Sequence, residues 1–106
     1  MISFDDFKKL NLVAATVTRV EPHPGADRLL LLTVDLGAEE RTLVAGIRES
    51  YRTDELVGKQ LVVVENLEPA TIRGVESRGM ILAAQDGQIL SLVTLDRAVA
   101  PGSPVS

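Results

Sequence analysis

The sequence predicts an all-β fold, a small barrel of short strands, and three observations lead to that fold class. Several segments alternate apolar and polar residues with a period of two, which places every second side chain on one face of a strand. Hydrophobic residues make up 45% of the chain but aromatic residues only 3%, so the core must consist mainly of aliphatic side chains, whose branched members suit a pleated surface. The length of 106 residues fits a single domain.

Three of the expected strands lie in the first half of the chain. Residues 12–21 and 29–36 show the alternation clearly. The short polar stretch 37–40 then connects the second strand to a third at residues 41–45, as a hairpin requires. We therefore expect the second and third strands to be antiparallel neighbours.

Two short helical pieces are expected outside these strands. Ser3 can cap a helix over residues 4–10, because its hydroxyl can accept a hydrogen bond from an exposed amide of the first turn. Within residues 47–57, Thr53 can cap one or two helical turns, and Gly58 can take the left-handed conformation that ends them.

The second half begins with three consecutive valines in residues 59–65, which is typical of a strand buried on both faces. Residues 66–78 contain a proline and a glycine and show little alternation, so we predict a structured loop or β-arc. A fifth strand at 80–84, a tight turn at Asp86-Gly87 and a sixth strand at 89–95 follow. A tail without periodicity ends the chain.

This order of elements, with a helical piece between the third and fourth strands, is that of the OB-fold, a five-stranded, partly open Greek-key barrel. The prediction is one domain over residues 1–106, with a short N-terminal helix and a C-terminal extension. Other small barrels would give a similar series of strands.

Composition excludes several classes of function. The chain has no cysteine and one histidine, so neither thiolate chemistry nor a metal site is expected. His23 and Asp27 could form a base with its orienting carboxylate, but no nucleophile or second acid lies nearby in sequence, and a histidine that rigidifies its loop is the better interpretation. We predict no catalytic residue, no metal and no cofactor.

Neither a membrane span nor a signal peptide is expected. No apolar run approaches the roughly 20 residues that cross a bilayer, and the first residues lack the basic and apolar regions of a leader. A cytoplasmic protein is therefore predicted. The net charge of −4 points away from a strong nonspecific nucleic-acid binder.

Two polar loops occupy the positions where OB-folds usually meet a ligand. The first, residues 22–28, contains two prolines and ends in Arg28, whose guanidinium can fork onto a phosphate. The second, residues 66–79, offers Arg73, Ser77 and Arg78. Plain surface loops that bind no ligand would have similar sequences. Because the chain has only three aromatic residues, stacking of single-stranded bases is largely excluded, and an RNA ligand would be recognised by the shape and backbone of its fold.

An ordered set of fragments carries a resemblance to a known family. The fragments are DF at residues 6–7, HPGADRL at 23–29, LTVDLG at 32–37, VAGI at 44–47, LVGK at 56–59 and GVESRGMILA at 74–83. Together they resemble the tRNA-binding domain appended to the C-terminus of methionyl-tRNA synthetase. That domain also occurs as a separate β subunit of the synthetase, as a free-standing tRNA-binding protein, and in relatives proposed as secretion chaperones.

The resemblance implies a non-catalytic module that recognises the outer corner of tRNA by its structure and assists a catalytic aminoacyl-tRNA synthetase. It also implies a homodimer held by the terminal extensions, residues 1–11 and 88–106. From the loops and the resemblance together, the residues predicted to bind RNA are Arg28, Asn66, Arg73, Ser77, Arg78 and Met80.

Two other functions stay open. Gly25 stands where the family commonly has Asn, and residues 66–71 lack the Lys and Arg that the family usually carries there. This depletion, with the acidic net charge, favours a peptide-binding chaperone of the same fold. The apolar termini would equally suit an architectural subunit of a multi-subunit synthetase.

Overall fold

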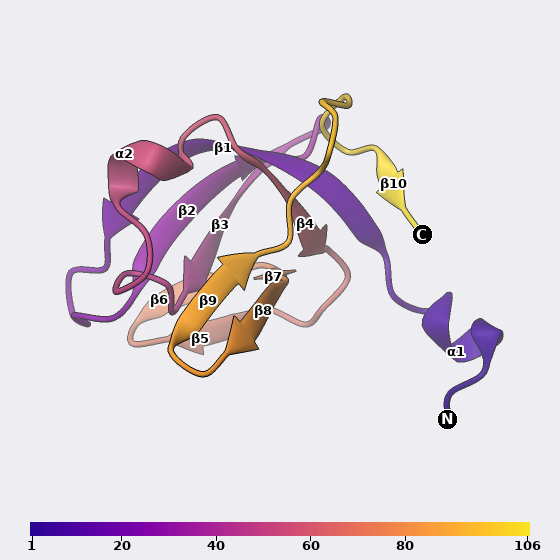
Figure 1. Ribbon diagram of the computed structural model, residues 1–106, viewed down its shortest axis with the longest axis horizontal. Helices are drawn as coiled ribbons and strands as arrows, with labels where there is room; N and C mark the ends of the chain where they lie inside the picture. Colours follow the sequence, from indigo (N-terminus) through magenta and orange to yellow (C-terminus); the bar gives the residue numbers. More distant parts are fainter.

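The computed structural model describes residues 1–106 as a curled β-sheet, with a short helix projecting on one side (Figure 1). In chain order the elements are α1 (Phe4–Phe7), β1 (Leu12–Pro22), β2 (Leu30–Asp35), β3 (Glu40–Ala45), α2 (Thr53–Leu56), β4 (Gln60–Val64), β5 (Ala70–Ile72), β6 (Val75–Ser77), β7 (Met80–Ile81), β8 (Ala83–Asp86), β9 (Ile89–Leu92) and β10 (Pro104–Val105). The main sheet has the order β3-β2-β1-β4-β7, so β1 is central and is antiparallel to both of its main neighbours.

The long strand β1 curves around the barrel and belongs to both of its halves (Figure 1). Its register against β2 shifts between Val17 and Arg19, which leaves Thr18 as an irregularity in the ladder. A bulge of this kind increases the local bend and twist of a strand. The bend allows the first part of β1 to pair with β4 and the last part to pair with β2.

The barrel closes where the chain between β6 and β7 meets β3. The Ser77 hydroxyl accepts a hydrogen bond from the Val44 N–H at 2.9 Å, and the Arg78 N–H donates to the Thr42 carbonyl at 3.1 Å. Gly79 lies at this seam, where an added Cβ would come within 3.1 Å of a leucine methyl and 3.2 Å of a backbone carbonyl. The close approach requires glycine. This closure and the strand order confirm the predicted OB barrel.

The core inside the barrel is aliphatic, as the composition predicts. Its 14 buried residues are Val13, Ala15, Val17, Leu30, Leu32, Val34, Leu36, Leu43, Ala45, Ile47, Leu56, Leu61, Val63 and Leu92. In β4, residues 61–64 are all buried, which confirms the strand buried on both faces.

The C-terminal tail, which shows no periodicity in the sequence, nevertheless contains a short strand. Its last residues form β10, which pairs with the start of β1 through Leu12 and Val105. The Gln60 side chain holds the tail further back: its Nε2 donates to the Val99 carbonyl at 2.7 Å, and its Oε1 accepts from the Val99 N–H at 3.0 Å. A strand of two residues is too short to show alternation, which explains why the pattern did not predict it.

Three details of the second half also differ from prediction. Residues 66–78 contain a two-stranded hairpin, β5 with β6, where a structured loop or β-arc was expected. The fifth strand divides at Leu82 into β7 and β8, because Leu82 donates to β4 while its carbonyl accepts from Val93, so the chain passes there from one sheet to the next. The turn after β8 consists of Gly87 and Gln88, one residue later than predicted.

The first helix is shorter than expected, whereas the second is a single turn, as predicted. Ser3 does cap α1, with its hydroxyl accepting from the Asp6 N–H at 3.1 Å, but the helix ends at Phe7 and buries no side chain. In α2, Thr53 is the first helical residue, and the capping position before it makes no side-chain hydrogen bond. Gly58 has a φ of 92°, which confirms its left-handed conformation. No helix has the length and apolar character needed to cross a membrane.

Candidate nucleic-acid interface

The loop between β1 and β2 is held against the β5–β6 hairpin by one side chain. We call residues 23–29 the His23 loop. The His23 ring is 3% exposed; its Nδ1 accepts from the Gly25 N–H at 2.9 Å, and its Nε2 lies 3.1 Å from the Ile72 carbonyl oxygen. Because a backbone N–H can only donate, Nδ1 is unprotonated and Nε2 carries the proton that it donates to the carbonyl. The ring is neutral and joins two loops.

This arrangement decides between the two interpretations of His23. Both ring nitrogens are engaged with the backbone, so neither is free to take a proton from a substrate. Asp27 makes no hydrogen bond to the ring. The structure also contains no group of three or more His, Cys, Asp or Glu side chains that could hold a metal ion. His23 therefore holds the loop, as the sequence indicated.

The β5–β6 hairpin turns through Arg73 and Gly74, and both residues have positive φ, 52° and 84°. Since Ile72 pairs with Val75, these two residues form the whole loop of the hairpin. Such turns favour Asn-Gly, because a side chain with a Cβ is strained in the left-handed region and asparagine tolerates it best. Arg73 is the one residue other than glycine with positive φ in the chain. An arginine at a strained tip points to a function of its side chain.

Arg28 and Arg73 come together at this end of the barrel. With Ala26, Asp27 and Leu29 they line a hollow of about 320 Å³. The Arg28 Nε lies 3.3 Å from a Glu49 carboxylate oxygen, and both side chains are largely exposed. An exposed pair of this kind contributes about 0–1 kcal/mol, so a phosphate can displace Glu49 at little cost.

Arg48 joins the same end and was not predicted. Its N–H donates to the Arg28 carbonyl at 3.4 Å, and the residue is exposed. Neither Arg48 nor Arg73 forms an ion pair with a carboxylate of the chain. The sequence signal was present in residues 47–57, but that segment was interpreted only as a helical turn. We call Arg28, Arg48 and Arg73, with the His23 loop and the hairpin tip, the loop end.

Ser77, predicted to lie at or beside the RNA surface, is 4% exposed. Its hydroxyl accepts from the Val44 N–H and donates to the Gly79 carbonyl at 3.2 Å. Both bonds belong to the seam that closes the barrel. The side chain therefore holds β3 against the last part of the sheet and does not reach solvent.

The other predicted residues lie away from the loop end. Asn66 is exposed, but its Oδ1 accepts from the Asn11 N–H at 2.8 Å and its Nδ2 donates to the Lys9 carbonyl at 2.7 Å. It ties the segment after α1 to the barrel. Met80 is 49% exposed and follows the seam, and Arg78 lies 4.0 Å from Glu76. Asn66, Arg78 and Met80 thus stand apart from the hollow that Arg28 and Arg73 share.

Arg41 is a charged residue with a structural role that was not predicted from the sequence. It shares the inner face of β3 with Leu43 and Ala45, and its side chain is only 18% exposed. Its guanidinium pairs with Glu39 and donates to the Glu65 carbonyl at 2.7 Å. The hydrogen bond and the charge of Arg41 lower the pKa of the Glu39 carboxyl below its usual value. The sequence did contain a signal for this role, because Arg41 is a charged residue at a position of the β3 alternation that faces inward.

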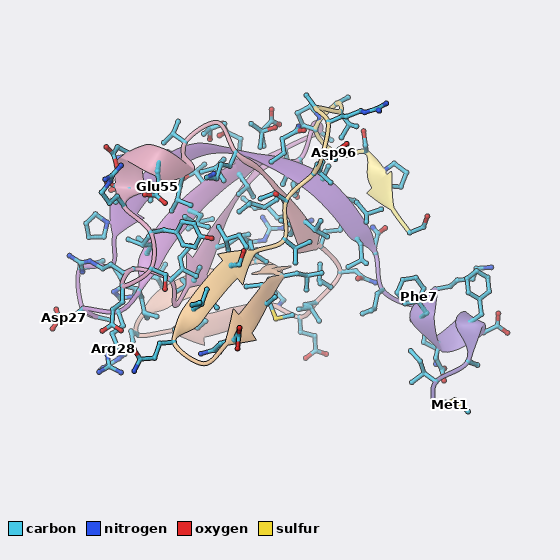
Figure 2. All side chains as sticks on the ribbon, in the orientation of Figure 1. Met1, Phe7, Asp27, Arg28, Glu55 and Asp96 are labelled. Atoms are coloured by element: carbon cyan, nitrogen blue, oxygen red, sulfur yellow. The ribbon has the colours of Figure 1, made fainter.

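The terminal segments lie at the opposite end of the molecule. Figure 2 shows Met1 and Phe7 on one side and Asp27 and Arg28 on the other. Four apolar residues of the first ten, Met1, Ile2, Phe4 and Leu10, are exposed. We call residues 1–11, with the tail from residue 99, the arm end.

A closed OB barrel with unpaired arginines on its loops, and with both chain termini kept away from them, defines a nucleic-acid-binding module. The family model described as "Putative tRNA binding domain" matches residues 12–104. The chain belongs to this tRNA-binding domain family, which confirms the resemblance seen in its sequence.

Similar proteins fall into two groups. The chain is 51% identical over 105 residues to methionine–tRNA ligase of Thermotoga maritima, covering 99% of this chain but 17% of the ligase. For the ligase of Pyrococcus horikoshii the identity is 47%, and 14% of the ligase is covered. The chain thus spans less than a fifth of these relatives.

Two solved structures match over nearly their full length. A methionyl-tRNA-synthetase-related protein of Pyrococcus horikoshii has a TM-score of 0.94 and 34% identity, covering 100% of this chain and 98% of that protein. The chaperone CsaA of Bacillus anthracis has a TM-score of 0.92 and 28% identity, covering 100% and 99%. The same barrel is therefore found within large synthetases and as a separate protein.

Proposed function

We propose that this chain binds folded tRNA through its loop end, as a non-catalytic module that serves a cytoplasmic aminoacyl-tRNA synthetase. The observation that carries the proposal is the meeting of Arg28 and Arg73 around one hollow, on two loops that are far apart in the sequence. Guanidinium groups fork onto phosphate oxygens, and contacts to phosphates position a protein on a nucleic acid without reading its sequence. Arg48, without an ion pair, adds a third cation.

The acidic net charge is compatible with this proposal because binding depends on local charge. The chain as a whole has a charge of −4. At the loop end, Arg48 and Arg73 have no ion pair, and the partner of Arg28 is an exposed carboxylate. A modest basic surface on an acidic protein gives weak binding to random nucleic acid, so the spacing of its cations matters more than their number.

A homodimer would supply the missing affinity, and we propose that the arm end forms its interface. The helix α1 buries no side chain, and Phe4 is 72% exposed. A helix of four residues is not stable in water unless it packs against something. A second copy is the simplest partner, since a two-fold axis repeats both the apolar arm and the arginine hollow, and two linked sites bind far more tightly than one.

The direct test is a titration of the purified protein with total tRNA over a salt series. Binding should weaken as salt rises, because each phosphate contact releases counterions. For the substitution Arg73→Gln at the loop end, Arg97→Gln is a matched control. Arg97 is 92% exposed, and its carboxylate partner is the neighbouring Asp96, which lies far from Arg28 in Figure 2. Absence of binding at low salt, or binding that ignores salt, would refute the proposal.

A peptide-binding chaperone is the second candidate, favoured by the likeness to CsaA over the full length of both chains. In that case the protein should suppress aggregation of an unfolded client, and added tRNA should not compete. If tRNA does compete for the client, the loop end serves both ligands. A purely architectural role in a synthetase complex would instead appear as capture of a synthetase after nuclease treatment, without measurable affinity for tRNA.

A further inference from the structure

We infer that His23 is a positioning residue, which fixes the distance between the two arginine-bearing loops and so sets the affinity for RNA without touching it. This inference rests on the proposed function and adds to it a residue that acts through Arg73. His23 lies on one loop, and the carbonyl to which it donates belongs to Ile72, the residue directly before Arg73.

The connection that His23 makes is not duplicated. Its Nε2–H bond to the Ile72 carbonyl is the one hydrogen bond between residues 23–29 and the β5–β6 hairpin. The hairpin is a separate two-stranded sheet, held to the barrel mainly at its Ser77 end. Arg73 lies at its other end, where φ is already strained at 52°. Without the bond, the hairpin tip and the His23 loop would move independently.

Independent loops would bind RNA less well even with every arginine present. The phosphates of a folded RNA have fixed spacings, and loops that must be ordered on binding lose conformational entropy at that moment. A bond that orders them beforehand removes that loss. The ring is 3% exposed, so RNA cannot contact it directly.

Two substitutions separate the two hydrogen bonds of the ring. In His23→Asn the shorter amide reaches the position of Nδ1 and can still accept from the Gly25 N–H, but it does not reach Ile72. In His23→Gln the longer amide places its N–H near the position of Nε2 and can still donate to the Ile72 carbonyl. If His23 acts by coupling the loops, the glutamine variant preserves binding and the asparagine variant does not.

The experiment measures the tRNA affinity of five proteins. They are the wild type, the single variants His23→Asn, His23→Gln and Arg73→Gln, and the double variant that combines His23→Asn with Arg73→Gln. We expect His23→Asn to weaken binding about fivefold, the loss of one neutral hydrogen bond, and His23→Gln to stay within about twofold of wild type. In the Arg73→Gln background, His23→Asn should add nothing, because the residue through which it acts is gone. Fully multiplicative losses, or unchanged binding in His23→Asn, would overturn the inference.

Amide hydrogen exchange without RNA tests the coupling separately from the function. Exchange of the amides in residues 70–77 should speed up in His23→Asn and stay native in His23→Gln, while the core strands remain protected in both. Equal hairpin exchange in all three proteins would refute the coupling whatever tRNA does. Conversely, if the two variants show this exchange pattern but the wild-type protein binds no tRNA, the proposed function is refuted and the coupling stands.

Discussion

The two ends of the molecule are built in opposite ways. At the loop end, charged side chains are exposed on loops whose backbones are fixed by a buried histidine, a two-residue turn and a barrel seam. At the arm end, apolar side chains are exposed on a helix that buries nothing and is tied to the barrel mainly through Asn66 and Asn11. The loop end thus has a backbone fixed within one copy of the chain, whereas the arm end leaves its apolar side chains uncovered.

This difference separates two kinds of binding energy. A preorganised charged surface loses little entropy when a ligand arrives, but exposed charges in water give modest affinity. An unsupported apolar arm gains order and buried surface on association, which is the usual driving force for dimers. Under the proposed function, one end selects the ligand and the other multiplies its affinity. Three of the predictions below alter one end or the other, and the fourth alters an ion pair that lies outside both.

The largest effect is expected when the two charges of the hollow are reversed together. In the double variant of Arg28→Glu and Arg73→Glu, tRNA affinity should fall by about 100-fold at low salt, because each change removes a phosphate contact worth roughly 1–2 kcal/mol and adds repulsion. The salt dependence should also flatten. Both residues are exposed, so the melting temperature and the sedimentation coefficient should not change. Unaltered affinity would locate the RNA surface elsewhere.

A smaller loss of affinity is expected from the arm. Phe4→Asp places a charge on an exposed apolar helix, so sedimentation should show a monomer where the wild type is a dimer. Affinity for tRNA should drop by about tenfold through the loss of the second site. The far-UV circular dichroism spectrum should stay the same, since Phe4 packs against nothing in the barrel. A wild-type monomer would contradict the dimer proposal, and a dimer that survives Phe4→Asp would locate its interface elsewhere.

Arg73→Asn should move stability and binding in opposite directions. Asparagine tolerates positive φ, so the free energy of unfolding should rise by about 0.5–1 kcal/mol, while the lost cation weakens tRNA binding about fivefold. Denaturant titration and tRNA titration on the same preparation provide the two measurements. Gly58→Asn is the control, because it changes a residue of positive φ outside the loop end. A gain in both properties would show that Arg73 has no function in binding.

The smallest effect concerns the pH dependence of stability that arises from the pair of Glu39 with Arg41. The pKa of Glu39 is lowered in the folded protein by Arg41, so its carboxylate stabilises the fold at neutral pH. That contribution is lost as the pH falls through the lowered pKa, because both folded and unfolded forms are then protonated. Glu39→Gln should therefore be slightly less stable than wild type at pH 7 and equal to it at strongly acidic pH. Affinity for tRNA should be unaffected at pH 7.

The sequence predicted the barrel well because its strands depend on local patterns. Alternation in β2, the valines of β4 and the polar hairpin before β3 each record which faces are buried, and burial is what an amphipathic pattern encodes. The cap at Ser3 and the left-handed Gly58 are likewise properties of a few neighbouring residues. These features needed no knowledge of distant contacts.

What the sequence did not predict depends on contacts between distant segments. An arginine in the left-handed region hides the β5–β6 turn, since the usual signal is Asn-Gly. The strand β10 exists only because β1 offers it a free ladder position. Ser77 looked like a polar loop residue until the barrel closed around it. Of the predicted RNA-binding residues, Arg28 and Arg73 meet at one hollow, because the fold places the His23 loop beside the β5–β6 hairpin.

The tail is attached to the barrel at a point where two backbones touch without side chains between them. A Cβ on Gly37 would lie 2.6 Å from the Pro101 carbonyl oxygen, and one on Gly102 would lie 2.3 Å from that of Leu36. Neither position can accept even alanine without separating the two segments. A single methyl group at either glycine would therefore loosen the attachment of the last strand, and it would leave the arginine hollow, which the tail does not line, as it was.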